Sequence, residues 1–125
     1  MGYTIAQASK KCGLSRDTLR YYDKEGLLPF VGRNGNGYRE FSDQDLEWLG
    51  LICCLKNTGM PLREIREVIA LTARGDGTLR QRRQILIRHR AEVLAQIGAL
   101  KKNLEKIDRK IACYEREEKT PRAEA

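Results

Sequence analysis

Four side chains within a short stretch near the start of the chain have the chemistry to bind a nucleic acid. Arg16 and Thr18 come first, and Arg20 and Tyr21 follow within one helical turn. On a helix, short polar and guanidinium groups near the N-terminus can reach base edges in a major groove, whereas Arg and Tyr further along can bond phosphate oxygens. The stretch therefore predicts a helix that recognises DNA.

The residues around this stretch provide the signals that begin and end such a helix. Ser15 can cap the free N–H groups of the first turn, and Gly26 can adopt the left-handed conformation that closes a helix. A shorter helix is expected over residues 4–11, followed by a tight turn at residues 12–14. This spacing is that of a helix-turn-helix.

A β-hairpin is expected next, over residues 30–41. Extended-type residues flank a centre rich in Gly and Asn at residues 34–37, which suits a turn that needs positive φ. We interpret the hairpin as the wing of a winged helix-turn-helix.

Two further helices are predicted before the pattern changes. Ser42 and Asp45 form a capping pair that opens a helix ending near residues 58–59, and Pro61 begins a shorter one. Gly75 and Gly77 close it, so we expect a DNA-binding domain over residues 1–74.

From Val93 onward the apolar side chains recur alternately every three and four residues, which is a heptad repeat. Counting back by the same rule gives Arg90, Leu86, Arg83 and Leu79, so the repeat is mixed at its start. A helix over about residues 78–117 would be about 60 Å long, too long for the small first domain to cover its apolar stripe. We therefore expect a homodimer joined by a coiled coil over residues 75–118, with a flexible tail over residues 119–125. The fold class is mainly α, with a small β-hairpin. The apolar heptad positions, here called the seam, are Val93, Ile97, Leu100, Leu104, Ile107, Ile111 and Tyr114.

The composition of the chain indicates which class of partner it binds and in which compartment it is expected. The net charge of +7 favours polyanions such as DNA, and no apolar run is long enough to be a membrane span or signal peptide. We expect a cytoplasmic protein with reduced cysteines and no membrane partner. The four cysteines lack the spacing of a zinc site, and the lone His89 has no nucleophile and orienting group around it. Hence no metal site, no cofactor and no enzymatic activity are expected.

The motifs at residues 18–23, 26–29 and 37–39, followed by the long helix, resemble the MerR family of bacterial transcription regulators. The resemblance implies a winged helix-turn-helix and an antiparallel coiled-coil homodimer. It also implies binding to a pseudo-palindrome in a promoter whose spacer is too long for RNA polymerase. On receiving a signal, members of the family distort this double-stranded DNA so that both promoter elements align, which is an indirect readout.

The resemblance assigns expected roles position by position. The base-facing start of the recognition helix holds Arg16, Asp17 and Thr18. The positions that match phosphate or backbone contacts are Arg20 and Tyr21 in the helix, and Arg33, Tyr38 and Arg39 in the wing. Leu19 and Tyr22 are expected to pack in the core.

The cysteines bear on the signal that is sensed. Residues 45–49, 54–60 and 75–76 resemble the small NmlR-like and AdhR-like branch that responds to aldehydes, nitrosothiols and related electrophiles, which carries a single functional Cys at the place of Cys54. On a helical wheel Cys53 points into the apolar sector, whereas Cys54 lies among small and polar residues. Cys54 is therefore the expected sensor thiol and the more accessible of the two.

Two alternatives remain open on the sequence. One is a metal-responsive activator that uses Cys113 together with Cys53 or Cys54 of a second copy. The other is a coiled-coil interaction module without regulatory DNA binding, which leaves the recognition helix and the wing unexplained.

Overall fold

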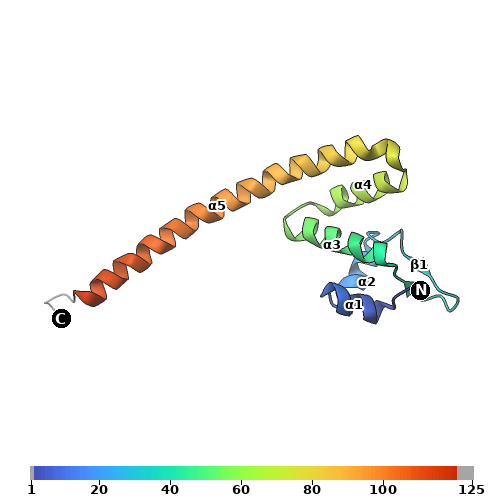
Figure 1. The fold of residues 1–125 in the computed structure, drawn as a ribbon, viewed down its shortest axis with the longest axis horizontal. Coiled ribbons are helices and arrows are strands. Elements are labelled where there is room, and N and C mark those ends of the chain that lie inside the picture. The colour runs from blue at the N-terminus through green and yellow to red at the C-terminus, as the bar shows by residue number, and fades with distance from the viewer. Residues whose placement is uncertain (1, 121–125) are drawn as a thin grey trace. The chain divides into compact units, whose positions relative to one another are not determined.

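The computed structural model of the protein describes residues 2–120 and is mainly helical, as the sequence predicts (Figure 1). The predicted tail over residues 119–125 lies mostly outside the described residues. The elements, in chain order, are α1 (Ile5–Cys12), α2 (Arg16–Lys24), β1 (Gly32–Arg33), β2 (Arg39–Glu40), α3 (Asp43–Asn57), α4 (Leu62–Ala73), a 3₁₀ turn η1 (Asp76–Thr78) and α5 (Leu79–Lys119).

The predicted helix-turn-helix is confirmed as α1 and α2. Gly13 ends α1 in the left-handed conformation, with φ of 72°, and its N–H donates to the carbonyl of Ser9. The Ser15 hydroxyl then accepts from the N–H of Thr18 at 3.0 Å and caps α2. Because both ends of the turn are fixed by hydrogen bonds, the two helices keep a defined angle. We call α2 the recognition helix.

The wing is confirmed as an antiparallel pair, β1 with β2, in which Arg33 lies opposite Arg39. The side-chain oxygen of Asn34 organises the turn, because it accepts from the N–H groups of Asn36 at 2.9 Å and Tyr38 at 3.1 Å. Gly37 supplies the positive φ, 82°, that the turn requires.

Helices α3 and α4 begin where the sequence predicts. Ser42 and Asp45 form a reciprocal capping box, and Pro61 stands immediately before α4. The core of the first compact unit, which ends at Ile85, is built from the helices α1–α4, the start of α5 and the loop residues beside the hairpin. Its most deeply buried large side chains are Phe41, Leu19, Leu27, Leu28, Leu49, Ile52 and Ile65.

A hydroxyl holds the corner between α4 and α5. The Thr78 side chain is 6% exposed, and its Oγ1 lies 2.6 Å from the carbonyl of Leu71 and 2.8 Å from that of Gly75. Ile85, two turns into α5, is also buried, so the start of α5 belongs to the first compact unit. The predicted domain boundary at residues 74–75 stays a prediction.

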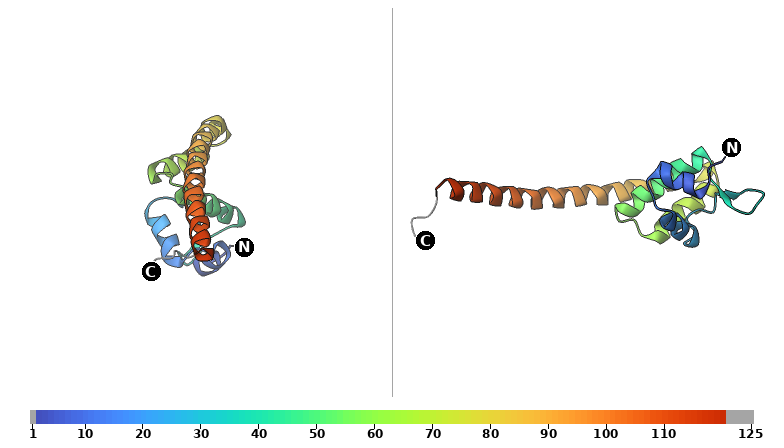
Figure 2. Two further views of the ribbon diagram at one scale, coloured as in Figure 1. Left: turned by 90° about the vertical axis from the view of Figure 1, so that its left-hand side faces the viewer. Right: turned by 90° about the horizontal axis from the view of Figure 1, so that it is seen from below.

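The long helix is confirmed, and it is one uninterrupted α-helix (Figure 2). The seam residues from Ile97 to Tyr114 are between 43% and 68% exposed in the single chain. No helix within residues 2–120 combines the length and the apolar character needed to cross a membrane.

Replacing Thr78 by Val should lower the free energy of unfolding by about 1–2 kcal/mol, because the carbonyls of Leu71 and Gly75 lose the hydroxyl donor that they share and Arg82 Nε loses an acceptor. Urea denaturation of the full chain measures this. Thr72→Val is the matched control, since the Thr72 hydroxyl bonds only the Val68 carbonyl of its own helix, at 2.8 Å. Equal losses for both variants would contradict the role given to the corner.

Candidate nucleic-acid interface

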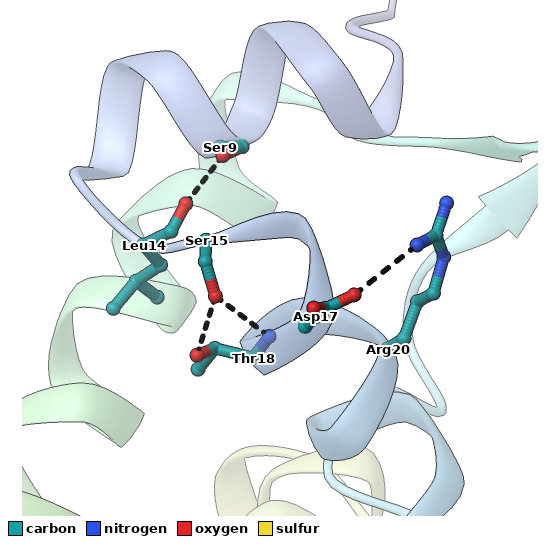
Figure 3. Close-up of polar contacts among 6 residues, drawn as sticks. All are labelled: Ser9, Leu14, Ser15, Asp17, Thr18 and Arg20. Carbon is teal, nitrogen blue, oxygen red and sulfur yellow. Dashed lines mark hydrogen bonds and ion pairs between the residues drawn. The ribbon is translucent and has the colours of Figure 1, made fainter.

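The outer face of the recognition helix presents its polar side chains to solvent (Figure 3). Arg16 and Asp17 are exposed, and the Thr18 hydroxyl lies 2.8 Å from that of Ser15. The side chains of Asp17 and Arg20 are 95% and 63% exposed and form an ion pair at 3.5 Å. An exposed pair of this length contributes little stability, so both groups are free to turn toward DNA.

The inner face of the same helix anchors it. Leu19 is fully buried and Tyr22 is 3% exposed, as predicted. Burial raises the pKa of the Tyr22 hydroxyl, and the neighbouring Cys53 raises it further by charge repulsion and a hydrogen bond. Tyr22 therefore stays neutral and serves as a packing residue, while Tyr21 beside it remains 42% exposed.

A lysine from another helix joins the interface, and sequence reasoning did not identify it. The Nζ of Lys56, near the end of α3, lies 4.4 Å from the ring centroid of Tyr21 and 5.5 Å from that of Tyr22. A groove of about 470 Å³ runs here, lined by Leu14, Asp17, Thr18, Tyr21, Tyr22, Cys53, Lys56 and Asn57. The structure thus places a cation beside the recognition helix, next to the rings of Tyr21 and Tyr22.

A second groove, of about 550 Å³, lies between the recognition helix, the start of α1 and the wing. It brings together four side chains predicted to contact phosphates or the DNA backbone, Arg20, Arg33, Tyr38 and Arg39. Tyr38 is 72% exposed at the wing turn, and the Arg33 guanidinium donates to the Gly37 carbonyl at 2.8 Å. A groove with three guanidinium groups and a phenol at its edge suits a phosphate of the DNA backbone.

Arg39 also forms an ion pair within the protein. Its guanidinium forms a two-bond ion pair with Asp23, with Nε 3.1 Å from Oδ2, and it also donates to the Val31 carbonyl. The two side chains are only 22% and 29% exposed. This pair joins β2 to the last turn of the recognition helix and fixes the position of the wing.

The C-terminal end of the recognition helix is also tied to α4. The Nε of Arg66 donates to the Glu25 carbonyl at 2.7 Å, and its Nη2 lies 2.9 Å from the Glu25 carboxylate. Because Glu25 caps α2, Arg66 links α4 directly to the C-terminal end of the recognition helix.

The thiols differ in accessibility as predicted for α3. Cys54 is exposed, whereas Cys53, Cys12 and Cys113 are half-buried. The Sγ of Cys53 accepts from Asn57 Nδ2 at 3.3 Å. Burial raises the pKa of Cys12, with a further rise from Cys53, which favours the protonated form of the Cys12 thiol at neutral pH. Cys54 is the thiol with the freest approach.

Comparison with known proteins agrees with this geometry. Residues 3–72 match the family model described as MerR HTH family regulatory protein, and residues 46–110 match the model described as MerR, DNA binding. The chain belongs to the MerR family.

Individual relatives place the chain within this family. It is 47% identical over 116 residues to an uncharacterized HTH-type transcriptional regulator of Haemophilus influenzae, covering 93% of this chain and 86% of that one. It is 37% identical over 90 residues to the regulator AdhR of Bacillus subtilis, covering 72% and 64% of the two chains. The MerR regulator is thus a DNA-binding transcriptional regulator, and its relatives are regulators rather than enzymes.

A solved structure of a MerR family regulator has the same fold as this chain. The crystal structure of HiNmlR, described as a MerR family regulator lacking the sensor domain, bound to promoter DNA, superposes with a TM-score of 0.86 at 45% identity. The match covers 96% of this chain and 95% of that one. Together with AdhR, it supports assignment to the NmlR-like and AdhR-like branch.

Replacing Asp23 by Asn should weaken DNA binding severalfold, although it removes a negative charge, because Arg39 no longer fixes the wing. The measurement is fluorescence anisotropy on an operator duplex selected by the wild-type protein from a random-sequence pool. Glu40→Gln is the control, because it removes a wing carboxylate that has no ion pair among the described residues. Tighter binding by Asp23→Asn would show that charge, not wing position, dominates.

Proposed function

We propose that this MerR regulator is an activator that binds a promoter-spacer pseudo-palindrome as a homodimer. When an aldehyde or nitrosothiol reacts with Cys54, the dimer distorts the DNA and aligns the promoter for RNA polymerase. It acts in the bacterial cytoplasm, where promoter and polymerase are found. The observation that carries the proposal is an exposed thiol, Cys54, on the helix that also supports the recognition helix.

The recognition helix supplies the contacts with bases. Arg16, Asp17 and Thr18 enter the major groove from its N-terminal turn, where guanidinium, carboxylate and hydroxyl groups can discriminate base edges. The exposure of Arg16 and Asp17 and the weak pairing of Asp17 with Arg20 support this role.

Phosphates on either side hold the domain in register. Arg20 and Tyr21 bind the backbone from the helix, and Arg33, Tyr38 and Arg39 act from the wing, Arg39 also through its ion pair with Asp23. Lys56 adds a cation next to Tyr21. A dimer repeats these contacts at a second half-site, which gives the operator its two-fold symmetry.

The chemistry at Cys54 is simple addition or transfer. The thiol adds to formaldehyde, forming a C–S bond while its proton moves to the carbonyl oxygen, and the product is an S-hydroxymethyl group. With a nitrosothiol, the NO group passes to the Cys54 sulfur and the donor sulfur takes the proton. Either reaction adds bulk and polarity on the surface of α3.

A short path connects this modification to the DNA-binding face. Both the N–H and the hydroxyl of Thr58 donate to the Cys54 carbonyl, at 3.1 and 2.8 Å. Lys56, two residues after Cys54 at the same end of α3, lies over the rings of Tyr21 and Tyr22. A shift in the end of α3 therefore changes the support of the recognition helix directly.

The thiol assignment is tested by comparing Cys54→Ser with Cys53→Ser in a promoter-reporter strain exposed to formaldehyde or a nitrosothiol. Cys54→Ser should lose most of the induction, and Cys53→Ser should keep it because its half-buried thiol already bonds Asn57. An undiminished response of Cys54→Ser would overturn the assignment.

Lys56→Gln should weaken binding to the selected operator several-fold and reduce the slope of log affinity against log salt by about 1, as expected for loss of one phosphate contact. Anisotropy titrations at several salt concentrations measure both quantities. The control is Lys102→Gln, an exposed lysine of α5. An unchanged salt slope with weaker binding would mean that Lys56 supports Tyr21 without touching DNA.

A further inference from the structure

Charge is distributed very unevenly along this chain. Residues 1–73, which hold the DNA-binding face, have ten basic and nine acidic residues, whereas residues 74–90 have six basic residues and one acidic one. The opposite end of α5 carries an acidic cluster, Glu115, Glu117 and Glu118. The long helix is thus basic at its start and acidic near its end.

The seam assigns a heptad position to every residue of α5. Counting back from it in steps of three and four, Arg83 and Arg90 fall at a positions and Leu79 and Leu86 at d positions. The same count places Arg80 and Glu115 at e positions, beside the seam. Both side chains are exposed, and within residues 2–120 neither has an ion-pair partner in its own chain.

We propose that a second copy of this chain pairs with α5 in one register, with Arg80 opposite the partner's Glu115 at each end of the coiled coil. The inference rests on the homodimer of the proposed function and adds which residues select its alignment. In an antiparallel pair of helices, each residue at heptad position a packs against a residue at position d of the other helix. Residues at position e face residues at position e of the other helix. Alignment of Leu79 with the partner's Glu118 uses the whole length of α5.

This register accommodates the two arginines within the seam. Arg83 falls in the layer of the partner's Tyr114, where a guanidinium can stack on an aromatic face, and Arg90 falls in the layer of the partner's Ile107. A parallel alignment would instead place Arg83 against the partner's Arg83, and Arg90 against the partner's Arg90. Two layers of like charge would then occupy the interface.

Shifting the antiparallel pair by one heptad is also less favourable. One shift shortens the overlap and brings Arg80 opposite the partner's Asp108. In that register Tyr114 and Glu118 have no residue of the partner helix opposite them, and Arg82 faces the partner's Lys110. A shift in the other direction leaves Leu79 and Arg83 unpaired and brings Lys101 against the partner's Lys101. All three registers keep the same number of fully apolar layers, so the charged pairs beside the seam decide between them, and they favour the register that places Arg80 opposite the partner's Glu115.

Charge reversal in the full-length protein tests the register. Arg80→Glu and Glu115→Arg should each weaken the dimer about tenfold, because each change turns two attractive pairs per dimer into repulsive ones. The double variant should restore the dissociation constant to within threefold of wild type. Arg88→Glu makes the same charge change at an f position on the outer face and should leave dimerisation within threefold. Sedimentation velocity over a dilution series measures all four variants.

Two results would overturn the register. Failure of the double variant to recover dimerisation would show that residues 80 and 115 do not meet, and rescue of Arg80→Glu by Asp108→Arg would establish the shorter overlap. Sedimentation needs no DNA and no inducer, so the test is independent of the promoter and of Cys54. If the wild-type protein sediments as a monomer, the proposed homodimer itself is contradicted.

Discussion

The orientation of the recognition helix is the constraint on which the rest of the structure depends. With nine residues, α2 is too short to be stable alone in water, so its position is set by its neighbours. Burial of Leu19 and Tyr22 fixes one face, the Arg39–Asp23 pair joins its last turn to the wing, and Arg66 holds its end from α4. Elements α1, α3, α4 and β2 all contact this helix or its end, so a change in any of them is expected to alter its position.

The near-neutral net charge of residues 1–73 makes the position of each cation important for DNA binding. A strongly basic domain can bind DNA through its overall field, with little demand on geometry. Here, nine carboxylates offset ten cations, so affinity depends on where Arg20, Arg33 and Lys56 are placed. A regulator that responds to a small displacement of α3 benefits from this dependence, because a shift of a few cations changes how the duplex is held.

Local chemistry made much of the fold predictable. The helix ends at Ser15, Gly13 and Ser42 could be predicted because capping depends on a few adjacent residues. The hairpin could be predicted from the Asn and Gly residues of its turn. The heptad repeat likewise predicts the long helix. The contacts that complete the site could not be read in this way. Lys56 meets Tyr21, and Arg66 meets Glu25, across 35 and 41 residues of sequence, and no spacing rule connects residues on helices that come together only by packing.

Under the proposed function, modification of Cys54 changes the shape of the bound promoter DNA without releasing it. Fluorescence energy transfer between dyes at the two ends of the operator duplex measures this shape, with saturating protein, before and after formaldehyde or nitrosothiol treatment. We expect a change in transfer efficiency at constant occupancy for the wild-type protein, and none for Cys54→Ser. Unchanged transfer in the modified wild-type complex, or dissociation of the complex, would contradict it.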